Sequence, residues 1–286
     1  MEFDALKDTV DNLKENDAVD CIGITFTGDK AEETKIYYYE KKNKKSTDIE
    51  KFEVANNADN DRKYFRVIQN KDKEYSEIID KFKRENGITD EIIVASALYE
   101  LCKIASEYDD QTRLRLSLLG IQKFNSGRKV IKSYFSLRKF MSRMDVRGIK
   151  QSFKEMQDIF EKIQESCMLD PNYHEILNDL SEFLEKQEYY PSMIGLNQED
   201  DKLEFKLYFE LFSTNKFWGN IKNHTMRTIK YICDYFDIQE EEYYEVNKIF
   251  IENGYFLRGV AISNRCDEKK SIKLRLYYFP TYRFTW

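Results

Sequence analysis

A basic residue followed two places later by a tyrosine occurs in four separate segments of this sequence, and the pairing suggests a particular chemistry. A buried Lys or Arg needs an anionic partner, and each charge-assisted hydrogen bond to one contributes about 1.5–3 kcal/mol. Aromatic faces attract cations by about 1–2 kcal/mol where water is excluded. Such residues suit a pyrophosphate and the allylic carbocation that a departing pyrophosphate leaves. The pairs are Lys35/Tyr37, Lys132/Tyr134, Lys206/Tyr208 and Arg275/Tyr277.

Each pair belongs to a longer repeat that predicts a β-hairpin. An apolar strand with a glycine near its end is followed by a polar turn and then by the strand that carries the pair. Both strands alternate with period two and are rich in β-branched and aromatic residues. The fourth unit has a longer turn than the others. The separations are 12 residues from Gly23 to Lys35, 12 from Gly120 to Lys132, 11 from Gly195 to Lys206 and 16 from Gly259 to Arg275.

A fifth hairpin is predicted between the first and second units, from residues 49–55 and 62–69. It would bring the number of strands to ten. Lys63 and Arg66 lie in its second strand. Because strand side chains alternate, only one of these two can share the face of the other basic residues.

Segments of helical periodicity lie before and between the hairpins. Apolar residues recur there at spacings of three and four, as at Ile78, Ile79 and Phe82. The chain therefore reads as αββα units in a single domain, residues 1–286. The predicted helical ranges are 2–16, 75–86, 90–108, 145–166, 172–187, 216–236 and 240–253.

Helix pairs between sequential hairpins can cover only one face of the resulting antiparallel sheet. We therefore expect an α/β protein of the α+β type, a ten-stranded antiparallel β-barrel of repeated αββα units with its helices outside. A basic residue and the tyrosine two places on share a face. The residues between them, Ile36, Ser133, Leu207 and Leu276, are mostly aliphatic, as expected under helices. The basic residues and tyrosines should then line the lumen, together with Lys273.

Several cations in one enclosed space require an anion. Burying an unpaired charge costs several kcal/mol, so a lumen with four or five basic residues should hold an anionic ligand such as pyrophosphate. A barrel of about ten strands leaves room for one. Water exclusion would also protect a carbocation beside the tyrosines.

Composition narrows the classes of protein that remain. The net charge is −6 and the basic residues are mixed with acidic ones, whereas a nucleic-acid-binding protein usually has a basic face. Five scattered cysteines, two histidines and no CxxC motif make zinc and disulfide interpretations weak. No apolar run approaches the roughly 20 residues of a membrane helix, and the first residues do not resemble a signal peptide. We expect a cytoplasmic monomer that binds neither nucleic acid nor membrane.

The repeated hairpins resemble the aromatic prenyltransferases of the ABBA (αββα-repeat, or PT-barrel) class over essentially the whole chain. The final strand, around Arg275 and Tyr277, is the closest local match, and the chain looks most like the cyanobactin-type peptide prenyltransferases. The resemblance implies transfer of a dimethylallyl or geranyl group from its diphosphate to an aromatic or other nucleophilic side chain of a (cyclic) peptide natural product. A small aromatic metabolite or a free amino acid is the alternative acceptor.

The resemblance also implies roles for individual residues. Asp20, just before the first strand's Cys21, matches the acidic residue that the family commonly places near the acceptor to take its proton. The sequence has no aspartate-rich metal motif, but some members use Mg²⁺ with the diphosphate, so metal dependence stays open. The diphosphate would be held by Lys35, Lys132, Lys206, Lys273 and Arg275, and the carbocation would be shielded by Tyr37, Tyr134, Tyr208 and Tyr277.

Other residues leave alternatives open. Arg113, Arg115 and Arg258 lie in first strands and could add donors to the diphosphate, and His224 is expected at the surface of a helix. A non-catalytic barrel that binds an anionic or aromatic ligand without turnover would have the same repeat. A helix-rich interaction protein is the third reading, with the hairpins in an ordinary sheet and the lysines in solvent.

Overall fold

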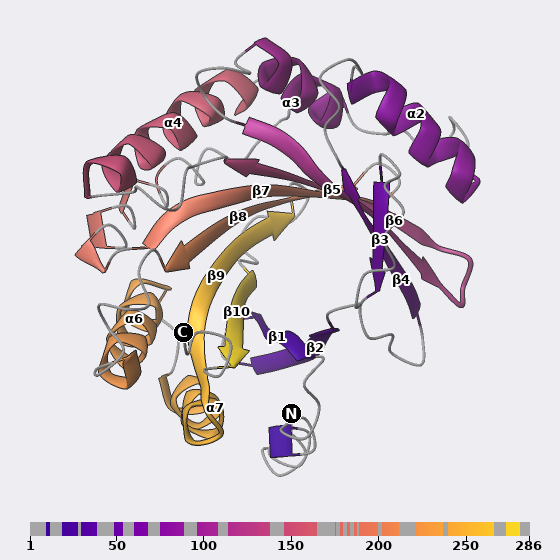
Figure 1. The fold of residues 1–286 in the computed structure, drawn as a ribbon. Helices are drawn as coiled ribbons and strands as arrows, with labels where there is room; N and C mark the ends of the chain where they lie inside the picture. The colour runs from indigo at the N-terminus through magenta and orange to yellow at the C-terminus, as the bar shows by residue number, and fades with distance from the viewer. Residues whose placement is uncertain are drawn as a thin grey trace.

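The fold is one strongly curled antiparallel sheet with helices packed on its convex face (Figure 1). The coordinates are those of a computed structural model. Together the strands and helices give an α+β protein, as expected from the sequence. The residues that the structure describes are 10–11, 19–27, 30–38, 49–53, 60–67, 75–88, 96–107, 114–137, 146–164, 175, 178–179, 182–183, 186–187, 189–199, 202–211, 221–236, 240–265 and 273–280.

Ten strands form this sheet as five consecutive hairpins. The first hairpin joins the last, because β1 pairs with β10, and the strand order is β2-β1-β10-β9-β8-β7-β6-β5-β4-β3. The predicted fifth hairpin is present as β3–β4. In the described part of the chain β2 and β3 end the order without pairing to each other, so closure into a barrel stays a prediction. The strands are β1 (Val19–Thr27), β2 (Lys30–Tyr38), β3 (Ile49–Glu53), β4 (Asn60–Val67), β5 (Leu114–Phe124), β6 (Lys129–Leu137), β7 (Tyr189–Glu199), β8 (Lys202–Leu211), β9 (Tyr255–Arg265) and β10 (Lys273–Pro280).

The helices follow the hairpins in the order that the periodicity predicts. Their limits agree with the prediction best at α2, and the described part of α3 lies within the predicted 90–108. The segments predicted as helices at 2–16 and 172–187 lie mostly outside the described residues. No helix in the described ranges is long and apolar enough to cross a membrane. The helices are α2 (Tyr75–Asn86), α3 (Ser96–Glu107), α4 (Val146–Gln164), α6 (Ile221–Phe236) and α7 (Glu240–Glu252).

The main hydrophobic core lies between the helices and the convex face of the sheet. Phe160 of α4 meets Phe205 of β8 edge to face, with ring centroids 5.1 Å apart. Leu207 and Leu276 are fully buried in the same core. Each such side chain stabilises the fold by roughly 1.5–3 kcal/mol through burial. Because these two leucines face the helices, the basic residue and the tyrosine on either side of each must face the concave side.

The first strands of four hairpins each contain a β-bulge, which breaks the alternation of their side chains. Ser117 and Ser192 are the extra residues in β5 and β7, and their hydroxyls donate to the carbonyls of Tyr134 (3.0 Å) and Tyr208 (3.4 Å). Arg258 is the extra residue in β9 and Asp20 in β1. At a bulge the direction of a side chain no longer follows from counting by two along the strand.

Candidate functional site

The concave face carries two adjacent layers, one of cations and one of tyrosines. Three of the predicted pairs lie on it in β6, β8 and β10, with the tyrosine two positions after the cation. The cations are 6%, 4% and 7% exposed, in the order given below. These pairs are Lys132/Tyr134, Lys206/Tyr208 and Arg275/Tyr277.

A fourth described pair, Arg62 and Tyr64 in β4, extends both layers but is missing from the residues predicted above. Both side chains are buried, at 4% and 7% exposed, and they share a face of the strand. Lys63 points the other way and forms a 3.0 Å ion pair with Asp61, with both side chains exposed. The side chain of Arg66 lies outside the described residues. The missed signal is simple, because Arg62 and Tyr64 repeat the basic-x-Tyr spacing of the other hairpins.

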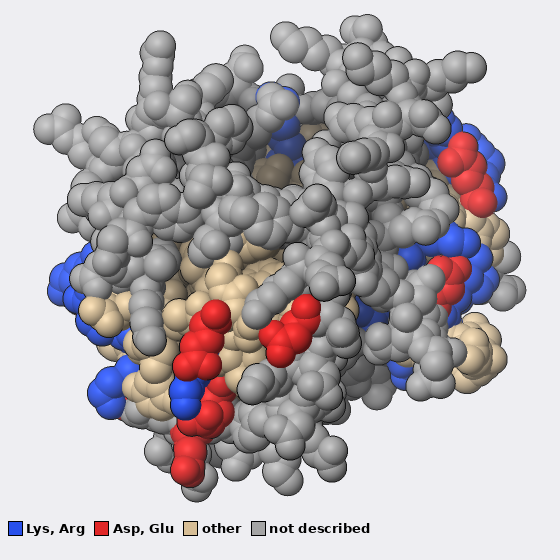
Figure 2. Space-filling view, turned by 60° about the horizontal axis from the view of Figure 1, so that its bottom comes forward, with Lys and Arg blue, Asp and Glu red and all other residues tan. Residues whose placement is uncertain are grey.

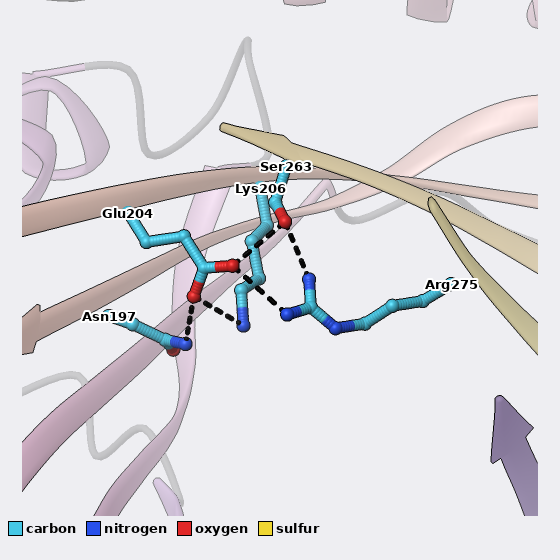
Figure 3. Close-up of polar contacts among 5 residues, drawn as sticks. All are labelled: Asn197, Glu204, Lys206, Ser263 and Arg275. Atoms are coloured by element: carbon cyan, nitrogen blue, oxygen red, sulfur yellow. Dashed lines mark hydrogen bonds and ion pairs between the residues drawn. The ribbon is translucent and has the colours of Figure 1, made fainter. Parts of the chain in front are cut away.

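A carboxylate at the centre of the cation layer was also not predicted (Figure 3). Glu204 of β8 contacts Lys206 Nζ at 3.1 Å and Arg275 Nη2 at 3.0 Å. It also accepts hydrogen bonds from Ser263 Oγ at 2.8 Å and Asn197 Nδ2 at 2.6 Å. Arg275 Nη1 donates to the same serine oxygen at 2.6 Å. Both carboxylate oxygens of Glu204 are therefore occupied by groups from four strands.

The side chain of Glu204 stays ionised in the folded protein. Burial by itself raises the pKa of this carboxyl, but Lys206 and Arg275, with the hydrogen bonds from Ser263 and Arg275, bring the pKa well below its ordinary value. Glu204 is thus ionised at neutral pH and acts as an internal counter-ion. It supplies part of the negative charge that the sequence led us to expect from a ligand.

Four basic side chains of the cation layer are buried. Arg62, Lys132, Lys206 and Arg275 are all buried, whereas no Asp or Glu of the described residues is buried to the same degree. Glu204, with its side chain 13% exposed, contacts two of these four cations, Lys206 and Arg275. Arg275 Nε is buried and has no hydrogen-bond partner within the described ranges. Four buried basic side chains on one face make this layer a candidate site for an anionic ligand.

The tyrosines form a continuous row beside the cations. Ring centroids lie 6.0 Å apart for Tyr64 and Tyr134, 5.9 Å for Tyr134 and Tyr208, and 5.9 Å for Tyr208 and Tyr277. Lys132 Nζ lies 6.0 Å from the centre of the Tyr64 ring. Burial raises the pKa of Tyr134 well above its ordinary value and that of Tyr277 to about 12, so both stay neutral. The row presents aromatic faces and hydroxyl donors rather than phenolate charge.

The repeated glycines make room for these rings. A Cβ atom at Gly120 would lie 2.8 Å from the Tyr64 ring, and one at Gly195 would lie 3.0 Å from Tyr208 and 3.2 Å from Tyr134. Glycine inside a strand commonly marks such a close approach. Gly120 and Gly195 are therefore kept free of a side chain by the tyrosines packed against them.

The fourth hairpin departs from this pattern. Ala261 takes the position between Tyr208 and Arg275 that a glycine holds in the other hairpins. Gly259 lies two residues before Ala261 in β9, between Glu210 of β8 and Tyr277 of β10. Matching Gly259 to the other glycines, as the sequence suggests, is therefore wrong. The bulge at Arg258 lies three residues before Ala261, as the bulges at Ser117 and Ser192 lie three residues before Gly120 and Gly195, so Ala261 is the structural counterpart of those glycines.

A cavity of about 170 Å³ lies against the tyrosine row. Its walls include the rings of Tyr64, Tyr134, Tyr208 and Tyr277, with Glu210 at the end away from the cation layer. Figure 2 shows a hollow in the upper part of its view, with Lys or Arg atoms and uncharged atoms in its depth. An apolar cavity of roughly 150 Å³ accepts a benzene-sized molecule, so this one can hold a small hydrocarbon group.

The remaining predicted site residues are placed only in part. Lys35 pairs with Gly23 and Tyr37 with Cys21 across β1 and β2, but the side chains of Lys35 and Tyr37 lie outside the described residues. The same holds for the side chain of Asp20. Lys273 begins β10, where it is half-buried. The roles expected of all four stay predictions.

One expectation about exposure is wrong, and one alternative reading loses support. His224 lies buried at 1% exposed, its ring stacked on Tyr189 and its Nε2 2.8 Å from the carbonyl of Gln187, because α6 turns this face toward the sheet. An interaction protein with an ordinary sheet would have Lys132 and Lys206 in solvent, but both side chains are buried. Their burial removes the main premise of that reading.

Metal ligands do not gather in the described part of the chain. No group of three or more His, Cys, Asp or Glu side chains lies together there. Glu204, already held by four partners, offers no free set of donors. We therefore derive no step through a metal ion, and metal dependence stays open.

No protein-family model matches this chain, and a search of the curated proteins finds no match. The family expected from the hairpin repeat thus stays a prediction. Function has to be inferred from the site itself.

Proposed function

We propose that the protein is a prenyltransferase that moves an isoprenyl group from its diphosphate to a nucleophilic acceptor. The observation that carries this proposal is the direct contact of two layers, buried cations on one side and a row of tyrosines with a cavity on the other. A molecule with an anionic head and a short hydrocarbon tail fits that order. The ABBA prenyltransferases that the sequence resembles would supply the same arrangement, with the curled sheet closed into a ten-stranded barrel.

The diphosphate would bind the cation layer. Lys132, Lys206, Arg275 and Arg62 would donate charge-assisted hydrogen bonds to its oxygens, with Lys35 and Lys273 as the further predicted donors. In the absence of ligand, Glu204 keeps Lys206 and Arg275 extended toward the concave face. Such preorganisation reduces the cost of ordering these side chains when the anion arrives.

The hydrocarbon tail would lie along the tyrosine row. When the bond between the allylic carbon and the diphosphate oxygen breaks, the electron pair leaves with the diphosphate and a carbocation remains. The faces of Tyr134, Tyr208 and Tyr277 would stabilise this cation, and closure of the barrel, if it forms as predicted, would keep water away. The cavity volume favours the five-carbon dimethylallyl group over geranyl.

The acceptor would be an aromatic or other nucleophilic side chain, with a (cyclic) peptide natural product as the first candidate. A small aromatic metabolite or a free amino acid is the alternative. If the diphosphate requires Mg²⁺, the ion would be carried mainly by the diphosphate itself, since protein ligands are sparse in the described residues.

Calorimetric titration with the thio-analogue of dimethylallyl diphosphate, which resists ionisation, tests the proposal. We expect micromolar binding with and without Mg²⁺, weaker binding of pyrophosphate alone, and weaker binding of the geranyl analogue. Absence of binding by any of the three compounds would overturn the proposal. Tight binding without turnover of dimethylallyl diphosphate on any acceptor would instead indicate a non-catalytic binding protein.

A further inference from the structure

The strand β8 carries a carboxylate that the proposed donor site does not use. Along its concave side β8 presents Lys206, Tyr208 and then Glu210. The equivalent positions after the tyrosine are Ser136 in β6 and Phe279 in β10. Glu210 lines the cavity at the end opposite the cation layer. Cation, ring and carboxylate thus follow one another at steps of roughly 7 Å, two residues of extended strand.

The surroundings of Glu210 leave one of its oxygens available. The Tyr190 hydroxyl donates to Oε2 at 3.3 Å, and Arg258 Nη2 lies 3.8 Å from the same oxygen. No hydrogen bond or ion pair within the described ranges engages Oε1. Burial, together with the charge of Glu210, raises the pKa of Tyr190, so this hydroxyl keeps its proton and donates. Both neighbours therefore hold Glu210 through Oε2 and leave Oε1 directed elsewhere.

The displaced glycine of the fourth hairpin opens space at the same place. Gly259 pairs with Glu210 on one side and with Tyr277 on the other, and it forms part of the cavity wall. A side chain at this position would narrow the cavity that Glu210 also lines. The bulge at Arg258 brings its guanidinium both to Glu210 and over the ring of Phe279, at 5.0 Å. Two departures from the repeat, a Glu after the tyrosine and a Gly opposite it, therefore coincide at one point.

We propose that Glu210 binds the acceptor through its O–H or N–H group and takes the proton released in the transfer. This inference rests on the proposed function. The allylic carbon loses its bond to the diphosphate, which keeps the electron pair, and forms a bond to the acceptor oxygen, nitrogen or ring carbon. The acceptor proton moves to Oε1 of Glu210 and then to solvent, which the 32% exposed side chain reaches. The acceptor class is a phenol, indole or other group with an ionisable or hydrogen-bonding X–H.

Turnover by the full chain separates this proposal from the proposed function. The probes are dimethylallyl diphosphate with the N-acetyl amides of tyrosine, tryptophan and arginine. Glu210→Gln should lower kcat by roughly 100-fold or more, the usual contribution of a general base. Its affinity for the thio-analogue should stay within about twofold of wild type, because the donor binds at the other layer. Glu210→Asp should restore part of the activity.

Glu245→Gln on the exposed side of α7 is the matched control, since it removes the same charge away from the cavity. Asp20→Asn tests the acid that the sequence predicts for the same role. Turnover of Glu210→Gln within about threefold of wild type, or its loss only in Asp20→Asn, would overturn the assignment to Glu210. Binding of the analogue with no reaction of any of the three amides would overturn the proposed acceptor class. Failure of the wild-type protein to bind the analogue would instead overturn the proposed function.

Discussion

Two glutamates of β8, Glu204 and Glu210, lie on the same concave face but in opposite environments. They are six residues apart, which in an extended strand corresponds to roughly 20 Å. Glu204 is 13% exposed and has both oxygens engaged by four neighbouring residues. Glu210 is 32% exposed, and its two described partners share a single oxygen.

The difference shows how neighbours divide one residue type into separate roles. A carboxylate whose oxygens are all occupied by cations and donors can hold those groups in place, but it has no lone pair directed at a ligand. A carboxylate that is only half occupied, beside a cavity, can accept a further hydrogen bond or a proton. On this basis Glu204 is a counter-ion and Glu210 the candidate for chemistry.

The largest effect should come from Glu204→Gln. Removing this charge leaves Lys206 and Arg275 buried beside a neutral amide, and breaking a buried ion pair costs about 3–5 kcal/mol. We expect a loss of that size in the free energy of unfolding, measured by urea denaturation. An unchanged stability would mean that the two cations find another partner as good as Glu204.

The pH dependence of stability gives a second view of the same carboxylate. The pKa of Glu204 is lowered in the folded protein, so its contribution is fully present above its ordinary pKa of 4.5 and is lost as the pH falls through the lower folded value. Unfolding free energy should therefore fall below about pH 4.5 in the wild type, and fall less steeply in Glu204→Gln. Equal slopes for the two proteins would contradict the depressed pKa.

Substitutions of the cations should weaken binding of the proposed donor. Lys132→Ala and Lys206→Ala should each lower the affinity for the dimethylallyl thio-analogue by about tenfold or more, since each removes a charge-assisted bond. Lys63→Ala is the control, because Lys63 pairs with Asp61 on the outer side. Calorimetry that shows equal losses for all three variants would point to general electrostatics rather than to a defined site.

Substitutions of the glycines packed against the tyrosine row should have a moderate effect on stability. Gly195→Ala places a methyl group 3.0 Å from Tyr208 and 3.2 Å from Tyr134, so the rings must shift at a cost of about 1–3 kcal/mol. Gly259→Ala meets its nearest atoms only at 3.4 Å and should cost less. Thermal unfolding of the two variants measures the difference, and the reverse order would contradict the packing described for the rings.

The smallest effect on stability is expected from Glu210→Gln. Its contacts with Arg258 and Tyr190 are long and partly exposed, and such pairs contribute about 1 kcal/mol or less. Urea denaturation should therefore show nearly wild-type stability for this variant. A loss as large as that of Glu204→Gln would remove the contrast between the two glutamates.

Much of the fold could be predicted from the sequence because its signals are local. Period-two and helical patterns predict the hairpins and helices, and the limits of α2 agree with the prediction residue by residue. Arg62 and Glu204 carried usable signals as well, since each lies two positions from a Tyr or Lys of the repeat. Glu204 is recognisable as a counter-ion only when β8, β9 and β10 are in register, because Arg275 lies 71 residues away.

Other features depend on geometry that residue types do not encode. The bulge at Asp20 interrupts the alternation of β1, so the facing of Asp20 cannot be predicted by counting, and the partners of Gly259 are known only from the pairing of β9 with β8 and β10. The burial of His224 depends on which side of α6 packs against the sheet. Glu210 is conspicuous only once the cavity beside it and the displaced glycine are known.

The packing of glycine against tyrosine has a consequence for how related chains would diverge. Gly120 faces Tyr64, and Gly195 faces Tyr208, across neighbouring strands. A bulkier residue at either glycine is compatible with the fold only if the facing ring becomes smaller, and a smaller ring alone leaves a void. Positions 64 and 120, and positions 195 and 208, should therefore covary as couples. The width of the cavity would then evolve in discrete steps, each step requiring two substitutions on neighbouring strands.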